Sequence, residues 1–225
     1  LSQAVPAARL QAIGRQRDEW ARDAVREMSR GEAAQALGKY IERGLVDVQA
    51  THKAAVREAA RQFLTDRAEV GPDRVQAIAA TNAQVRDLNS EIREGLRKSG
   101  ELAGAQAIQV RDGRDPEKSV KLELAKGERI VVTKNENTLN LKNGDFGTVV
   151  SVSPERITVR LDRTGEAVAF DPRAVAMRHG YAATTHRLQG STVERAIVLG
   201  SERTSREMAY VQASRSKGET RWYFS

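Results

Sequence analysis

The stretch HGYAATTHRLQGS at 179–191 gathers an unusual number of polar side chains between two apolar runs. It carries two threonines, two histidines, an arginine and a glutamine, together with two glycines. Burying such groups without hydrogen-bonding partners costs roughly 1–3 kcal/mol for each group. A segment of ordinary core would not carry them at this density. The stretch therefore predicts a site at which a polar ligand is bound.

A second set of polar residues follows a predicted strand. The run VQAIAA at 75–80 is apolar and of strand length, and Thr81 and Asn82 come directly after it. Both residue types favour the N-cap of a helix, and apolar side chains then recur at helical spacing. A strand that leads into a capped helix indicates an α/β fold, which places both residues where open α/β sheets bind ligands. N-capping alone is the alternative interpretation, and both roles are compatible.

The other elements of this fold are predicted from apolar periodicity and from glycine stops. Before residue 75 the pattern predicts helices over 15–29, 32–44 and 52–70 and a short strand at 45–48. After residue 171 it predicts a helix over 182–188, a buried strand at 195–200, a helix over 205–217 and a last strand at 220–224. We expect the polar groups of these segments to meet at one edge of a parallel sheet.

Between residues 101 and 170 the pattern changes to short β-rich runs. GERIVVTKN, GDFGTVVSV, ERITVRLD and EAVAFD are separated by turn signals at Asn143-Gly144, Ser153-Pro154 and Thr164-Gly165. These runs predict a small antiparallel barrel of the SH3-like type. We therefore expect a discontinuous α/β domain at 1–100 and 171–225, with the barrel at 101–170 inserted into it.

Composition limits the classes of function. The chain has 225 residues and no cysteine, which excludes disulfides and thiolate metal sites, and its three histidines are scattered. A net charge of +7 suits a polyanionic partner such as nucleic acid, although an interspersed, solvated surface explains it equally well. No apolar run approaches the roughly 20 residues of a membrane helix, so we expect no membrane insertion. A start at Leu1 suggests a segment excised from a longer protein.

The motifs, in this order, resemble those of superfamily 1 helicases of the RecD-like group. GYAATTHRLQGS with the strand RAIVLG resembles motif V, and MAYVQASRSKGE resembles motif VI. IGRQRDEWARDAV at 13–25 resembles motif IV, and AIAATNAQVRDLN at 77–89 resembles the segment before the inserted domain. Within that group the resemblance is strongest to the Ti-type relaxase-helicases of conjugative plasmids. It implies a cytoplasmic bacterial protein in which this chain is a RecA-like domain 2A with an SH3-like subdomain 2B inserted.

The resemblance also implies roles for individual residues. Arg15 and Arg215 match two arginines that stabilise the charge on a transferring γ-phosphoryl group. Gln16, Gln189 and Gly190 match positions that face the nucleotide, and a glycine there lets backbone amides approach an oxyanion closely. Thr192 stands where many members of the family have a glutamate for the ribose, so that sugar contact is not carried over. An ordinary solvated arginine is the alternative for each guanidinium.

Single-stranded DNA is the second ligand that the resemblance implies. Thr184, Thr185 and His186 match the part of motif V that touches the strand, and hydroxyl and imidazole groups suit phosphate oxygens without reading sequence. Thr81 and Asn82 would contact the strand from the helix N-terminus, where free amides favour an anion.

Half of an ATP site is missing from the sequence. It contains no GxxxxGK[ST] phosphate loop and no apolar strand that ends in paired acidic residues for Mg²⁺. In the family these belong to the preceding RecA-like domain, 1A. We therefore expect ATP and Mg²⁺ to bind only to the intact parent protein, and this chain alone to be inactive.

Two other functions remain open at this stage. The barrel could serve as a docking or secretion-recognition surface for the conjugation and type IV secretion machinery. The chain could also be a structural DNA-binding domain with inactive motifs, which is the weaker alternative because Arg15, Gln189 and Arg215 occur together in pattern.

Overall fold

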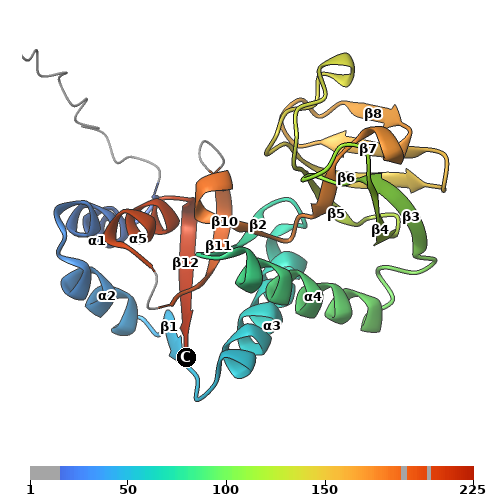
Figure 1. Ribbon diagram of the computed structural model, residues 1–225. Coiled ribbons are helices and arrows are strands. Elements are labelled where there is room, and N and C mark those ends of the chain that lie inside the picture. Colours follow the sequence, from blue (N-terminus) through green and yellow to red (C-terminus); the bar gives the residue numbers. More distant parts are fainter. Residues whose placement is uncertain (1–15, 189–191, 202–203) are drawn as a thin grey trace, which may run out of the picture.

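The protein has two lobes joined by two crossings of the chain (Figure 1). A computed structural model describes residues 16–188, 192–201 and 204–225. An α/β lobe contains the first and the last parts of the described chain, and a β lobe is inserted between helix α4 and strand β10. Within the described residues, no helix is both long and apolar enough to cross a membrane.

The α/β lobe is built on a five-stranded sheet in which every neighbouring pair is parallel. The strand order is β1-β12-β11-β2-β10. The strands are β1 (Val46–Val48), β2 (Val75–Ala79), β10 (Ala182–Thr184), β11 (Val193–Leu199) and β12 (Ser216–Phe224). The expected α/β class with a parallel sheet is thereby confirmed.

Helices cover both faces of this sheet. They are α1 (Glu19–Arg30), α2 (Ala33–Ile41), α3 (His52–Val70), α4 (Asn82–Lys98) and α5 (Arg206–Ala213). Alternate residues of a strand point to opposite faces, so Ile197 packs with α3 and α4 while Val198 packs with α1, α2 and α5. Each face therefore has its own apolar core, and β2 and β10 are fully buried between them.

The end of β2 and the start of α4 are fixed by local chemistry. All five residues of β2 are buried, which explains why four of them are apolar, and the buried Gln76 donates a hydrogen bond to the carbonyl of Tyr181 at 2.8 Å. Thr81 is the N-cap of α4, and its side chain accepts a hydrogen bond from the backbone N–H of Gln84. The Gln84 side chain accepts a hydrogen bond from the Thr81 N–H in return, which completes a capping box. Thr81 is thus confirmed as an N-cap, and Asn82 is the first helical residue.

The edge strand β10 is held from both sides. One side pairs with β2, with Ala182 opposite Ala77 and Thr184 opposite Ala79. On the other side, Asn89 of α4 accepts a hydrogen bond from the Ala182 N–H at 2.9 Å and donates to its carbonyl at 3.3 Å. A buried amide thus satisfies the backbone groups that an edge strand would otherwise leave unpaired.

The β lobe contains a five-stranded antiparallel sheet and a separate hairpin. The sheet has the order β8-β7-β6-β5-β9, and the hairpin pairs β3 with β4. The strands are β3 (Gln106–Arg111), β4 (Ser119–Leu124), β5 (Arg129–Val132), β6 (Phe146–Val152), β7 (Ile157–Leu161), β8 (Ala167–Phe170) and β9 (Met177–His179). The strands predicted at β5 to β8 are confirmed. Their inward side chains form a third apolar core.

Three local features differ from the sequence-based expectation. The segment 182–188, predicted as a helix, is strand β10 followed by a short 3₁₀ turn (Thr185–Leu188), because β10 pairs with β2. The hairpin β3–β4 was not predicted at all. Strand β9 hydrogen bonds to β5, so the antiparallel sheet extends to His179, beyond the boundary expected at residue 170.

The two lobes meet around a buried carboxylate. Glu128, which is fully buried, accepts hydrogen bonds from the Tyr181 hydroxyl and from Arg93 Nε, each at 3.0 Å. Arg93 lies on α4, and Glu128 directly precedes β5. Gly180 passes so close to β5 that an added Cβ would stand 2.6 Å from the carbonyl of Ile130. Gly180 and Tyr181, which belong to HGYAATTHRLQGS, therefore attach the β lobe to the α/β lobe.

Candidate functional site

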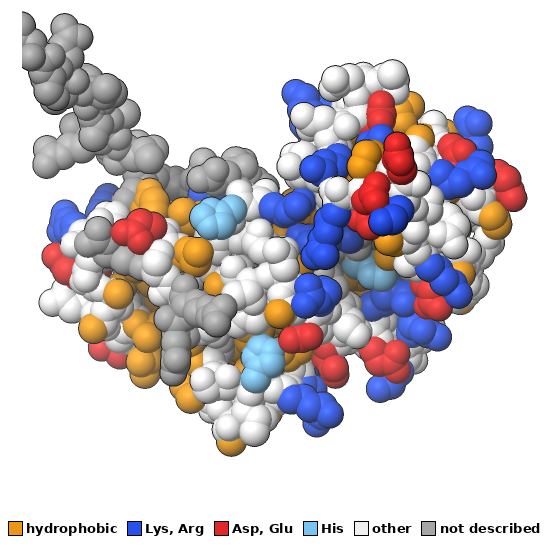
Figure 2. All heavy atoms as spheres, in the orientation of Figure 1, with side chains coloured by type: hydrophobic (Ala, Val, Ile, Leu, Met, Phe, Trp, Pro, Cys, Tyr) orange, Lys and Arg blue, Asp and Glu red, His pale blue; other side chains and the backbone are white. Residues whose placement is uncertain are grey.

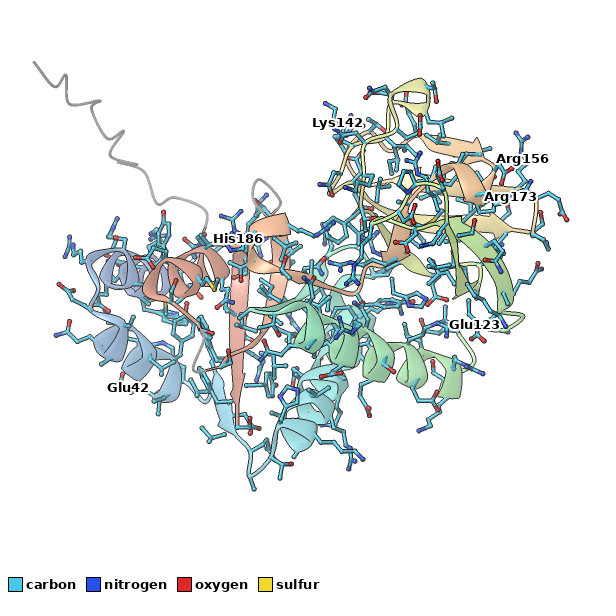
Figure 3. The ribbon with its side chains drawn as sticks, viewed as in Figure 1. Glu42, Glu123, Lys142, Arg156, Arg173 and His186 are labelled. Atoms are coloured by element: carbon cyan, nitrogen blue, oxygen red, sulfur yellow. The ribbon has the colours of Figure 1, made fainter. Side chains whose placement is uncertain are left out.

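The expected DNA-contacting residues lie together at the carboxyl ends of β2 and β10. Thr184 ends β10 in register with Ala79, the last residue of β2, and Thr81 follows that strand. Asn82 and His186 are exposed, whereas Thr184 and Thr185 are buried. His186 lies on the outer surface of the α/β lobe (Figure 3). The structure thus brings all five residues to one end of two neighbouring strands.

Thr185 has an internal role in addition to any contact with a ligand. Its hydroxyl donates a hydrogen bond to the carbonyl of Ala79 at 3.4 Å and accepts one from Gln212 Nε2 at 2.9 Å. Gln212 is fully buried on α5, and its Oε1 has no hydrogen-bonding partner in the part of the chain that the structure describes. Gln212 was not predicted as a site residue from the sequence, although it stands in the YVQASRSK segment. It joins the motif V residues to the helix that leads to Arg215.

The nucleotide candidates that the structure describes lie at the amino ends of β11 and β12. Arg215 directly precedes β12, and its guanidinium donates to the carbonyl of Leu188 at 3.0 Å and to that of Val211 at 2.9 Å. Gln16 is buried and donates to the carbonyl of Ser216 at 3.1 Å. Arg15, Gln189 and Gly190 lie outside the described residues. Arg215 and Gln16 are therefore neighbours, although about 200 residues separate them in the chain.

The expectation of a single site at one edge of the sheet is wrong. Thr81 and Thr185 lie at the carboxyl ends of their strands, while Gln16 and Arg215 lie at the amino end of β12. Because all five strands are parallel, these are opposite ends of the sheet. The connection from β10 to β11 spans the two ends, since it leaves β10 at Thr184 and enters β11 at Val193. The two groups of residues are thus joined by one connection and by the Gln212–Thr185 hydrogen bond.

Arg178 is a further candidate that sequence reasoning missed. It lies on β9, and its Nη1 donates to Asn82 Oδ1 at 3.2 Å. Its Nε and Nη2 are buried, and no described residue forms a hydrogen bond with either atom. Burial, together with the positive charges of Arg187 and Arg86, lowers the pKa of Arg178 to about 10. In the sequence, the feature that could have indicated a binding role for Arg178 is its position directly before HGYAATTHRLQGS.

A groove runs from Arg178 along the outer side of α4. It has a volume of about 400 Å³, and it is lined by Val85, Arg86, Asn89, Ser90, Glu91, Arg93, Glu94, Arg97, Arg178 and His179. Basic side chains collect along the junction of the two lobes in the space-filling view (Figure 2). Burial lowers the pKa of His179, whose Nε2 lies 2.9 Å from the carbonyl of Glu123. Four arginines therefore face this groove, and two glutamates lie among them.

The described part of the chain offers no cluster of His, Asp or Glu side chains suited to a metal ion. No protein-family model matches the chain.

The fold of both lobes together occurs in solved helicase structures. The Pif1 helicase of Bacteroides bound to single-stranded DNA matches 93% of this chain with a TM-score of 0.61 and 18% identity. The Pif1 helicase of Candida albicans matches 92% with a TM-score of 0.52 and 15% identity. The chain covers 50% and 54% of these two structures. The chain therefore has the fold of about one half of these Pif1 structures.

Relatives in sequence narrow this class. The conjugal transfer protein TraA of Rhizobium radiobacter is 31% identical over 223 residues, and TraA of Agrobacterium fabrum is 30% identical over 220 residues. Each alignment covers 96% of this chain and 19% of the relative, so the chain spans about a fifth of their length. The chain is thus a homologue of one segment of the TraA conjugal transfer proteins. The resemblance to conjugative relaxase-helicases that the motifs indicated is confirmed.

Proposed function

We propose that this chain is the C-terminal motor half of an ATP-dependent superfamily 1 DNA helicase within a conjugative relaxase-helicase. In that role the parent protein unwinds DNA and moves along a single strand during plasmid transfer. The observation that carries the proposal is the meeting of three distant segments, in which Arg215 contacts Leu188 while Gln16 contacts Ser216. These are the segments that resemble motifs VI, V and IV.

The nucleotide would lie between this chain and the preceding domain 1A. ATP supplies the γ-phosphoryl group, and 1A would hold its phosphates together with Mg²⁺. Arg215 is suited to a fixed position beside that group, because backbone carbonyls of Leu188 and Val211 hold its guanidinium. Arg15, Gln16, Gln189 and Gly190 would complete this half of the site. No role for Mg²⁺ is assigned to residues of this chain.

Single-stranded DNA would cross the carboxyl ends of β2 and β10. Thr81, Asn82 and His186 are the accessible candidates there, and Thr184 and Thr185 form the floor beneath them. Contacts to phosphate oxygens without base readout suit a motor that moves along any sequence. The Pif1 structure with bound single-stranded DNA supports this choice of ligand.

The two lobes would correspond to subdomains 2A and 2B. We propose that 2B is a barrel of the SH3-like type formed by 101–179, since β9 pairs with β5. Subdomain 2A then comprises 1–100 and 180–225. The hydrogen bonds of Glu128 to Tyr181 and Arg93 would fix 2B on 2A.

Two measurements on the 225-residue chain test this function. A fluorescently labelled oligothymidylate of about 20 nucleotides should bind weakly, with strong dependence on salt and with little preference for base sequence. His186→Ala should weaken binding, while Arg156→Ala, on the far side of the β lobe, should not (Figure 3). The same chain should show only background ATPase activity. Measurable ATP turnover would contradict the proposal that this chain holds only half of the ATP site. Oligothymidylate binding that depends neither on salt nor on His186 would contradict the proposed DNA site.

A further inference from the structure

The position of Arg178 is unfavourable in the protein alone. Its Nε and Nη2 are shielded from water without a hydrogen-bonding partner among residues 16–188, 192–201 and 204–225, although a guanidinium keeps its charge under ordinary conditions. A buried charged group is normally paired, because leaving it unpaired costs free energy. Among the described residues, no carboxylate forms an ion pair with Arg178. Within the described part of the chain, its guanidinium donates to the neutral side-chain oxygen of Asn82, at 3.2 Å.

The nearest charges increase this imbalance. Arg187 and Arg86 both lower the pKa of Arg178, which places two further cations within electrostatic reach. Arg187 donates to Asn143 Oδ1, another neutral acceptor, and Arg86 is exposed. The N-terminus of the 17-residue helix α4 lies at the same place, because Asn82 is its first residue. A helix N-terminus carries partial positive charge and favours an anion.

We propose that Arg178, together with Arg86 and Asn82, binds one backbone phosphate of single-stranded DNA at the junction of the two lobes. This inference rests on the proposed function and extends it beyond the motif V residues. The groove of about 400 Å³ along α4, which Arg86 and Arg178 line, gives the strand a path away from His186.

A phosphate suits this set of groups for two reasons. The planar guanidinium can form two parallel hydrogen bonds with one phosphate, which an ammonium group cannot do. Its two unsatisfied nitrogens are the donors that such a contact needs. Since they are shielded in the unbound protein, the side chain turns into the groove to meet the anion. The missing hydrogen bonds and the neighbouring cations favour that movement.

The test compares Arg178→Gln with Arg156→Gln in the 225-residue chain. Arg156 is an exposed arginine on the far side of the β lobe, so its variant makes the same change in net charge (Figure 3). Binding of the labelled oligothymidylate is measured by fluorescence anisotropy over a series of salt concentrations. Arg178→Gln should weaken binding about tenfold and reduce the slope of log K against log salt by about 0.7, the value of one phosphate contact on a single strand. Arg156→Gln should change the affinity less than twofold.

A stability measurement separates binding from a structural role. Loss of an unsatisfied buried cation should leave the melting temperature of Arg178→Gln equal to or above that of the parent chain, whereas a structural arginine would lower it. Arg86→Gln gives an independent variant, since this exposed side chain can change without disturbing the fold, and it should weaken binding about threefold.

The outcomes distinguish this inference from the proposed function. If the unaltered chain binds no oligothymidylate, the DNA role itself fails, and the phosphate site fails with it. If the chain binds and His186→Ala weakens binding, but Arg178→Gln and Arg86→Gln both match Arg156→Gln, the inference alone is overturned.

Discussion

Replacing Glu128 tests how much the buried contacts at the junction of the two lobes contribute to the stability of the protein. The fully buried carboxylate receives hydrogen bonds from Tyr181, from Arg93 and from the backbone N–H of Ala125 at 3.2 Å. The Arg93 side chain is itself only 11% exposed. Removing one partner of a buried ion pair costs about 3–5 kcal/mol, and in this variant Arg93 would keep only its contact with the half-exposed Glu123 among the described carboxylates. We therefore expect Glu128→Ala to lower the free energy of unfolding by about that amount.

The chain offers a matched control on the same arginine. Glu123 also pairs with Arg93, at 3.2 Å, but its side chain is 50% exposed. Because water screens such a pair, Glu123→Ala should lower stability far less than Glu128→Ala. Urea denaturation followed by circular dichroism measures both losses. An equal loss in the two variants would refute the argument from burial.

A double-mutant cycle tests whether the loss comes from the pair itself. Arg93→Ala alone leaves Glu128 buried without its cation, so it should also destabilise strongly. The double variant Glu128→Ala with Arg93→Ala removes both charges and should therefore lose less than the sum of the two single variants. Strict additivity would show that the two side chains contribute independently, contrary to the geometry of the junction.

Three further predictions concern other buried positions. Burial lowers the pKa of His179, so below about pH 6.5 the unfolded chain takes up a proton that the folded protein does not. The free energy of unfolding should therefore fall as the pH drops from there through the folded-state pKa. Thermal melts at several pH values measure this dependence, and His179→Gln should remove it. Gly180→Ala should destabilise by about 1–3 kcal/mol, because its Cβ would meet the backbone of Ile130, whereas Gly38→Ala, within α2 and with nothing within 4 Å, should stabilise by about 0.5–1 kcal/mol; equal denaturation midpoints would contradict both. Gln212→Ala should cost about 1–3 kcal/mol by the same assay, since it leaves the Thr185 hydroxyl without its donor, and an unchanged midpoint would show that this hydrogen bond contributes nothing.

The elements with strong local signals could be predicted from the sequence. Strand β2 was predicted because a fully buried strand is mostly apolar, and α4 was predicted because Thr81 caps an amphipathic repeat. The segment 182–188 was not, because its alanines and leucine are compatible with a helix and only pairing with β2 makes it extended. The hairpin β3–β4 was missed because most of its side chains are exposed and give weak apolar alternation.

The residues of the candidate site could be named from the sequence, but their positions on the sheet could not be predicted. Arg215 and Gln16 were named from motif resemblance, and the structure brings them to Leu188 and Ser216. Their separation from Thr81 across the sheet depends on strand direction, which a list of motifs does not contain. Arg178 could not be recognised by residue type, because what distinguishes it is missing partners in three dimensions.

The segment 177–184 belongs to both sheets, since β9 pairs with β5 and, after Gly180 and Tyr181, β10 pairs with β2. Only Gly180 and Tyr181 separate the two strands. A displacement of β9 with the antiparallel sheet would therefore be transmitted to Thr184 and to the turn that carries His186. The β lobe can act as a mechanical lever on the polar residues at the end of β10, rather than as a freely swinging appendage.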